Sequence, residues 1–308
     1  MNLALLAELL TILLWALGYI FIAYLNLFLD NYTQNFFRFT SAGLVLLIIS
    51  LIFNREKYLF SFKSLRKLLV PTIIVFLFQI FNVFGIALTT PTIATLVTRL
   101  SVIFVDIFSF FIFPDEKAVL RDRNFLIGSA IALIGTSGVI LSSSSLFPVG
   151  GSGNMLLLGG FSLIVTSVLW AGYIVSTKIL LEKVDPLSAT TNVFVISGLM
   201  YLPLSVISNG IYQITDVSWM VIFYLIVSGI LSVGIGNLLN NYAIQRLGAS
   251  LSTNLQLLVP VFTGILSLAI FGEPMPPMKL FFSLVALSGC WLILRTTTQE
   301  NSGRAQGK

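Results

Sequence analysis

Residues 3–25 read LALLAELLTILLWALGYIFIAYL, an apolar run in which Glu8 is the one charged side chain. A helix of about 20 mostly apolar residues is long enough to cross the hydrocarbon core of a bilayer. No basic segment precedes this run and no small-residue cleavage site follows it, which argues against a secretory signal peptide. We therefore expect a first membrane-spanning helix here.

The whole chain has the same character, since 57% of its 308 residues are hydrophobic and only 9% are charged. Soluble domains carry about 25% charged residues, so a soluble globular protein is excluded. The chain has no His and a single Cys, Cys290. These counts leave no ligands for a zinc or haem site, no disulfide and no His-based catalytic triad, and we expect neither a metal nor a cofactor.

Ten runs along the chain are long and apolar enough to span a membrane, which predicts an all-α polytopic membrane protein. With ten spans, both ends of the chain face the same side. The expected spans are 3–25, 34–53, 68–89, 92–113, 124–142, 155–181, 188–208, 219–241, 250–271 and 279–295.

The basic residues indicate which side that is. Of the 17 Lys and Arg residues, fourteen fall on the side of the termini in this topology, and only Lys279 falls opposite. The fourteen comprise five at 55–67, three at 117–123, two at 178–183, Arg246, and three from 295 onward. Because cytoplasmic loops are enriched in basic residues, we expect both termini in the cytoplasm and a plasma or inner membrane location.

The two halves of the chain resemble each other. LWALGYI at 14–20 matches LWAGYI at 169–174, and AIALIG at 130–135 matches LVALSG at 284–289. We therefore expect two five-helix repeats, residues 1–147 and 148–308. Because five is odd, the second repeat enters the bilayer from the opposite side. Such inverted repeats are typical of secondary transporters, whose substrate sites lie near the midplane between the repeats.

The repeat motifs resemble the EamA-type repeat of the drug/metabolite transporter superfamily. The matching residues of the second half are Trp170 to Lys178 (WAGYIVSTK), Asp185-Pro186, Asn241 to Ala249 (NYAIQRLGA), Pro260, Phe271 to Pro274 (FGEP) and the helix of Gly289; those of the first half are Trp15, Gly18, Arg38, Glu116, Gly128 and Gly135. The resemblance implies a ten-helix carrier that moves small organic metabolites, frequently amino acids, out of the cell.

The first half departs from this pattern in three places. Ile103 stands where the second half has Pro260, Asp115 replaces the Gly before Glu116, and Arg38 has no basic counterpart near Asn192. We expect the ninth span to be interrupted at its proline. The divergence of the two halves is what an asymmetric substrate would require.

Four charged residues lie in the interior of expected spans, away from the span ends: Glu8, Arg38, Arg99 and Asp106. A charge at the centre of a spanning helix costs about 2.5 to 3.5 kcal/mol on insertion scales, so these residues are functional candidates. Arg99 is the first choice for a substrate contact, because a guanidinium suits a carboxylate or phosphate; pairing with Asp106 or a helix-end carbonyl is the alternative. Glu8, Asp106 and Arg38 are expected in coupling or gating.

Neutral polar and aromatic side chains complete the candidate site. Amides offer donors and acceptors to a zwitterion, although they also hydrogen-bond between helices. Aromatic residues of the first and sixth spans could line a pore or pack against neighbouring helices. The expected substrate contacts besides Arg99 are Asn82, Gln79, Asn237, Asn241, Asn254, Trp15, Tyr19, Trp170 and Tyr173.

The sequence thus predicts a secondary transporter and not an enzyme. Its expected substrates are amino acids or related zwitterionic or carboxylate compounds, exported by alternating access. The alternatives are an exchanger of phosphorylated or nucleotide-type anions and a membrane-embedded lipid-modifying enzyme. We expect a small-molecule substrate and the lipid bilayer as partners and no nucleic acid, with monomer and homodimer both open.

Overall fold

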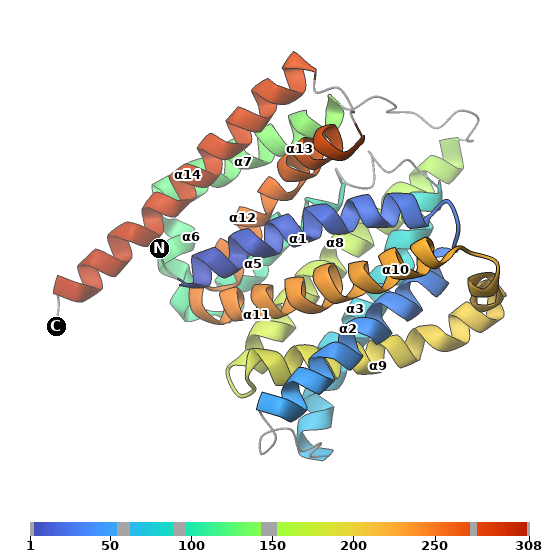
Figure 1. Cartoon of the computed structure of the whole chain (residues 1–308). Coiled ribbons are helices and arrows are strands. Elements are labelled where there is room, and N and C mark those ends of the chain that lie inside the picture. Colours follow the sequence, from blue (N-terminus) through green and yellow to red (C-terminus); the bar gives the residue numbers. More distant parts are fainter. Residues whose placement is uncertain (1–2, 54–61, 89–96, 143–152, 272–275, 307–308) are drawn as a thin grey trace. The chain divides into compact units, whose positions relative to one another are not determined.

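The computed structural model describes residues 3–53, 62–88, 97–142, 153–271 and 276–306. Within these ranges the chain folds into helices joined by short turns, with no strand, as Figure 1 shows. The expected all-α class is confirmed. Nine helices in this part of the chain are long and apolar enough to cross a membrane.

Most helix ends lie within three residues of the predicted spans, but the helix of the third span begins six residues earlier, the span from Trp219 ends six residues later, and the helix of the last span ends eleven residues later. The fourth span, expected at 92–113, is seen as a shorter apolar helix at 101–112, and residues 92–96 lie outside the described residues, so the count of ten remains a prediction. The helices are α1 (Leu3–Leu25), α2 (Asn31–Phe53), α3 (Phe62–Leu88), α5 (Ser101–Ile112), η1 (Pro114–Glu116), α6 (Lys117–Arg121), α7 (Arg123–Leu141), α8 (Gly153–Leu181), α9 (Pro186–Ile207), η2 (Gly210–Thr215), α10 (Trp219–Ser228), η3 (Gly229–Ile235), α11 (Gly236–Leu247), α12 (Ala249–Leu255), η4 (Gln256–Leu258), α13 (Val259–Phe271) and α14 (Pro277–Gln306).

Aspartates fix the start of three of these helices. Asp30 Oδ1 accepts hydrogen bonds from the backbone N–H groups of Tyr32 and Thr33 at the start of α2. Asp185, its repeat counterpart, accepts one from Ser188 at the start of α9, and Asp122 caps α7. A carboxylate there satisfies N–H groups that have no partner within the helix and interacts favourably with the helix dipole.

The chain forms two compact units, and each contains segments of both predicted repeats. The first unit comprises Met1–Gln79 and Gly172–Leu247, and the second comprises Ile80–Ala171 and Gly248–Lys308. Helices α3 and α8 therefore contribute residues to both units. The repeat boundary at residue 147 remains a prediction.

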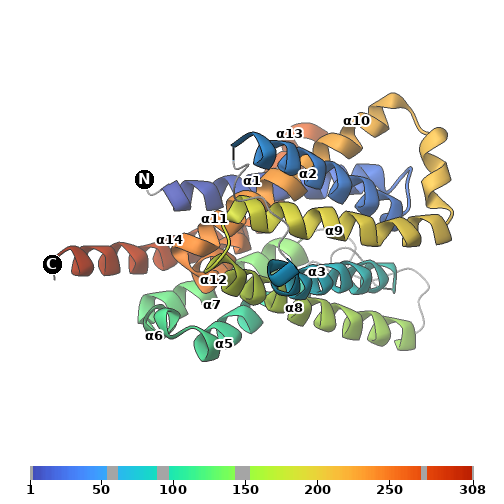
Figure 2. The same ribbon diagram turned by 90° about the horizontal axis from the view of Figure 1, so that it is seen from below.

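Glycines allow close helix packing inside each unit. In the second unit α7 lies along α14 (Figure 1), and a Cβ atom on Gly135 would collide with the backbone of Ala286. In the first unit α2 lies along α9 (Figure 2), where Gly43 faces the backbone of Val195. Small residues at helix interfaces let backbones approach, which drives association in lipid, where no hydrophobic effect acts between helices.

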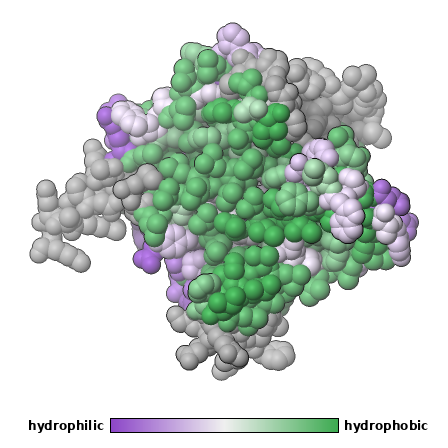
Figure 3. All heavy atoms as spheres, viewed as in Figure 1, coloured by the Kyte–Doolittle hydropathy of each residue, from purple (hydrophilic) through white to green (hydrophobic). Residues whose placement is uncertain are grey.

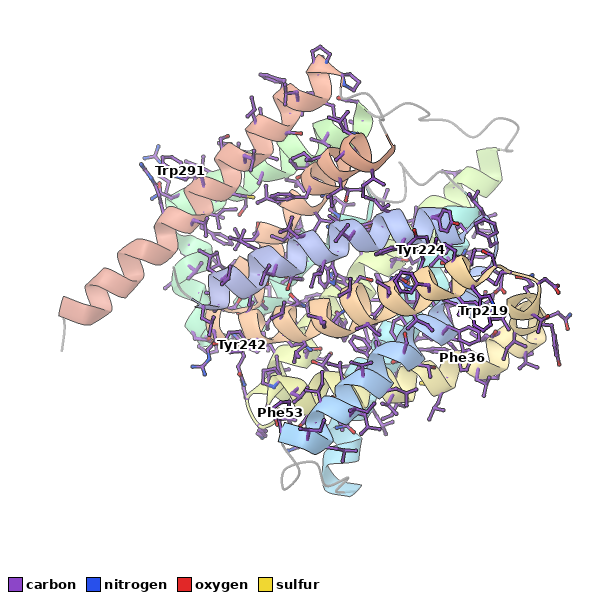
Figure 4. All side chains as sticks on the ribbon, viewed as in Figure 1. Phe36, Phe53, Trp219, Tyr224, Tyr242 and Trp291 are labelled. Atoms are coloured by element: carbon purple, nitrogen blue, oxygen red, sulfur yellow. The ribbon has the colours of Figure 1, made fainter. Side chains whose placement is uncertain are left out.

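The outward-facing side chains are suited to lipid. Figure 3 shows a face on which hydrophobic residues predominate, and large apolar side chains such as Ile48 and Phe111 are exposed. In the first unit, aromatic side chains lie near both ends of the helices: Figure 4 shows Phe36, Trp219 and Tyr224 toward one end and Phe53 and Tyr242 toward the other. Aromatic residues are typical of the two membrane–water interfaces.

We predict that Gly135→Val weakens the packing of α7 on α14. The added side chain would overlap the α14 backbone, and overpacking of this kind costs about 1 to 3 kcal/mol. The thermal unfolding midpoint in detergent should fall by about 5 °C or more. Gly160→Ala is the matched control, because a Cβ at Gly160 meets nothing within 4 Å. Equal midpoints for the two variants would contradict the packing account.

Candidate substrate site

The 29-residue span Trp219–Leu247 of the first unit is not a uniform α-helix. Its central turn, η3 (Gly229–Ile235), has the wider π-helical winding. π-Helical turns are rare and occur frequently at functional sites, because they shift side chains out of the regular helical register and leave carbonyl groups available. Ser232 lies in this turn and is buried.

Side chains from two other helices converge on Ser232. Trp15 Nε1 of α1 donates a hydrogen bond to the Ser232 carbonyl at 3.1 Å, and Arg38 Nη2 of α2 donates one to Ser232 Oγ at 3.1 Å. A Cβ atom on Gly18 would lie 2.7 Å from Ser232 Cβ, so α1 and η3 are in close contact there. Asn237 Nδ2 satisfies the Val233 carbonyl at 2.9 Å. Arg38, Trp15 and Asn237 are thus brought to one turn.

The Arg38 side chain is only 5% exposed. Within the described residues, Ser232 Oγ is the one hydrogen-bond partner found for its guanidinium, and the buried Nε has none. No ion pair of Arg38 is seen among the described residues, so the coupling or gating role expected for it stays a prediction. The guanidinium instead reaches the middle of the Trp219–Leu247 span.

In the second unit, the ninth span is interrupted where its proline predicts. Helix α12 gives way to the 3₁₀ turn η4 at Gln256, and α13 begins at Val259. Pro260 has no N–H, so the Gln256 carbonyl four residues earlier loses its helical donor. Arg99 Nη1 donates to that carbonyl at 3.5 Å, and Thr136 Oγ1 donates to the neighbouring Leu257 carbonyl at 2.7 Å. The helix-end carbonyl considered as a partner of Arg99 is therefore one of its contacts.

Asp106 and Asn254 are joined directly. Asn254 Nδ2 lies 3.0 Å from both carboxylate oxygens of Asp106 and also donates to the Ser250 carbonyl at 2.9 Å. Asp106 forms no ion pair with Arg99 in the described structure. A carboxylate beside the broken span is thus held by a neutral amide.

Glu116 has a role that spacing alone did not indicate. Its carboxylate is 5% exposed and accepts hydrogen bonds from the backbone N–H groups of Ala249 at 2.6 Å and Ser250 at 3.0 Å, which caps the N-terminus of α12. Gly248 precedes the cap with a φ of 95°, a conformation that favours glycine. The two partners are more than 130 residues apart in sequence, so only the resemblance pointed to Glu116.

The remaining candidates are distributed over both units. In the first unit Glu8 and Tyr173 are fully or almost fully buried, Tyr19 is 42% exposed, and Asn241 Nδ2 donates to Thr190 Oγ1 at 2.9 Å. Gln79 of that unit and Asn82 and Trp170 of the second unit are half-buried. No group of three or more potential metal ligands occurs among the described residues. Cys290 is buried.

Comparison with known proteins identifies the family. The model of the EamA-like transporter family matches residues 2–141 and 157–295. The chain belongs to the EamA-like transporter family. A Haemophilus influenzae protein described as an uncharacterized transporter is 26% identical over 309 residues, covering 94% of this chain and 96% of that protein. The chain is therefore a multi-pass membrane transporter of small molecules, and the resemblance seen in the sequence is confirmed.

A crystal structure has the same fold. It superposes with a TM-score of 0.79 at 17% sequence identity, covering 96% of this chain and 98% of the other. At this identity the similarity shows the fold alone. Most EamA-like features named from the sequence lie at structural contacts, such as Trp15 and Arg38 at Ser232, whereas Ser232 itself was missed because nothing in the sequence signals a π-helical turn.

We predict that Glu116→Ala destabilises the transporter. Removal of the carboxylate leaves two buried N–H groups of α12 without a partner, and loss of an N-terminal cap costs about 0.5 to 2 kcal/mol. Glu116→Gln should lose less stability than Glu116→Ala because the amide keeps one acceptor oxygen. Thermal unfolding in detergent measures both, with the exposed Glu182→Ala as the control. A Glu116→Ala midpoint equal to that of the control would show that the cap contributes nothing.

Proposed function

We propose that this EamA-like protein is a secondary transporter that exports amino acids or related zwitterionic or carboxylate compounds by alternating access. Transport as such follows from the family. The substrate class, the direction and the mechanism are inferred from the buried polar groups and from the pattern of charge along the chain.

The observation that carries the substrate class is the interrupted span of the second unit. One guanidinium, Arg99, contacts the break at Gln256, and one carboxylate, Asp106, is bonded to the amide of Asn254 in α12. A zwitterion presents the complementary pair of charges, an anionic carboxylate and a cationic ammonium. Broken helices in transporters commonly place free backbone carbonyls and helix ends at the substrate. A lipid-modifying enzyme would need a clustered acid/base group, which is not found in the described structure.

The orientation rests on the basic residues and their aromatic neighbours. Arg246 lies over the ring of Tyr242, with 5.8 Å to the centroid, and Arg295 lies over Trp291 at 3.8 Å. Both arginines belong to the predicted cytoplasmic set, and a cation beside an aromatic ring at a helix end is typical of an interface anchor. We infer that both termini are cytoplasmic, in the plasma or inner membrane, and that Glu8 and Asp106 are the carboxylates available for proton coupling.

We predict saturable flux of at least one amino acid in proteoliposomes containing the purified protein. The panel should hold the 20 proteinogenic amino acids and, to represent the phosphorylated anions, glucose 6-phosphate. Uptake by empty liposomes is the control. If only the sugar phosphate is transported, phosphorylated anions replace amino acids as the substrate class. If correctly inserted protein transports no compound of the panel, the proposed function is wrong.

Arg99→Ala should lower the initial rate for the transported amino acid by at least about tenfold, because hydrogen bonds to charged groups contribute about 1.5 to 3 kcal/mol. The measurement is initial flux normalised to the amount of folded, reconstituted protein. Arg121→Ala removes an exposed arginine of the same unit and serves as the control. A normal rate in Arg99→Ala would remove Arg99 from the substrate site.

A further inference from the structure

The guanidinium of Arg38 is buried without a counter-charge. It is 5% exposed, and its hydrogen bond to Ser232 Oγ joins it to a neutral hydroxyl. Ser232 Oγ also donates to the Ser228 carbonyl at 2.6 Å, so the hydroxyl is fixed in the π-helical turn with its oxygen presented to the guanidinium. The cation is therefore held in a defined position, and its charge is not neutralised.

The helices that pack against α2 supply no carboxylate. These are α9, α10, η2 and the π-helical turn η3. None of their sequences contains Asp or Glu, and Arg38 is the one charged residue of α2 itself. Asp30 precedes Arg38 by eight residues, about 12 Å along a helix, and its Oδ1 already accepts the two N–H groups at the start of α2.

Helix α1, which reaches Ser232 through Trp15, carries a single carboxylate. Glu8 precedes Trp15 by seven residues, about 10 Å along the helix. The next cation along the interrupted span is Arg246, fourteen residues and about 21 Å beyond Ser232. The turn at Ser232 therefore holds one positive charge and no negative one among the described residues.

A guanidinium in this setting is costly, and packing does not explain it. A charge in the interior of a spanning segment is unfavourable unless it is paired, and Arg is the residue type that stays charged. A neutral side chain at this position would avoid the cost of a buried charge.

We propose that Arg38 binds the carboxylate of the transported substrate at the π-helical turn, with Ser232 as the positioning residue. A single cation fits a monoanion better than a phosphate ester, which is typically held by a cluster of basic groups. The planar guanidinium has donors left over after its bond to Ser232 and can present two of them to one carboxylate.

This inference rests on the proposed function and deepens it, because it names a second residue, Arg38 of the first unit, for recognition of the substrate acid. Arg99 differs from Arg38 in that it also donates to a backbone carbonyl, that of Gln256. Arg38 donates to no backbone carbonyl among the described residues.

The test compares acids with their amides. Thermal stabilisation of the full-length purified protein is measured in chloride-free buffer with each proteinogenic L-amino acid, and binding of the best stabilisers is then compared with that of their primary amides. Wild type should bind the acid at least about tenfold more tightly than the amide, and Arg38→Gln should reduce this preference to less than about threefold. Arg38→Lys keeps the positive charge but lacks the planar guanidinium that can present two N–H donors to one carboxylate. Its preference for the acid should therefore be intermediate.

Two further variants separate recognition from folding. Arg246→Gln removes an exposed cation of the same unit and should keep the full preference for the acid. Ser232→Ala keeps the cation but frees it from its anchor, so binding of acids should weaken while the acid is still preferred. Without ligand, the unfolding midpoint of Arg38→Gln should equal or exceed that of wild type, because an uncompensated charge has been removed.

Retention of a tenfold acid preference by folded Arg38→Gln would overturn the inference and leave the proposed transport of amino acids intact. A fall of more than about 5 °C in the ligand-free midpoint of Arg38→Gln would also overturn it, since it would assign Arg38 a structural role. If no amino acid stabilises wild type, the proposed substrate class fails, and the ligand-free midpoints still decide whether the charge of Arg38 lacks a partner.

Discussion

The hydrocarbon core of a bilayer offers no hydrogen-bond partners, so each polar group inside a span must find a partner in the protein or in a ligand. Many polar side chains of the described residues meet this constraint within their own helix, as Thr72 does by donating to the Leu68 carbonyl. At the two interruptions, the π-helical turn at Ser232 and the 3₁₀ turn at Gln256, side chains from other helices reach the backbone carbonyls: Trp15 at the first and Arg99 at the second. Two of the charged residues inside the spans, Arg38 and Arg99, donate hydrogen bonds at these turns.

The two interruptions have different chemical causes and belong to different compact units. In the second unit Pro260 has no N–H to donate to the Gln256 carbonyl, which instead accepts hydrogen bonds from the Val259 N–H of the 3₁₀ turn and from Arg99. In the first unit no proline is present between Trp219 and Leu247; three glycines, Gly229, Gly234 and Gly236, flank or occupy the wider turn, and α1 and α2 approach it closely. The proposed substrate contacts, Arg38 and Arg99, lie at these two places.

Hydropathy predicted the spans well because the bilayer imposes one length on every crossing helix. The start of α2 was placed three residues late, since its first turn is polar and its Asp30 cap was not recognised. The candidate site was predicted in part: the cost of intramembrane charge singled out Arg99, Asp106 and Arg38. The contact of Arg38 with Ser232 was not predictable from helical periodicity, because a π-helical turn changes the register, and the pairing of Glu116 with Ala249 depends on the tertiary fold.

The central claim is that two five-helix repeats cross the membrane in opposite orientations, and labelling of single cysteines tests it most directly. Cys290 is the one cysteine, so Cys290→Ser provides a background without thiols. Ser145→Cys, in the uncharged stretch 142–154 where the two predicted repeats join, and Lys57→Cys, among the five basic residues at 55–67, are then exposed to a membrane-impermeant maleimide in intact bacterial cells. The account predicts that Ser145→Cys reacts at once and that Lys57→Cys reacts only after the cells are permeabilised. Reaction of both positions from the same side would contradict the inverted arrangement.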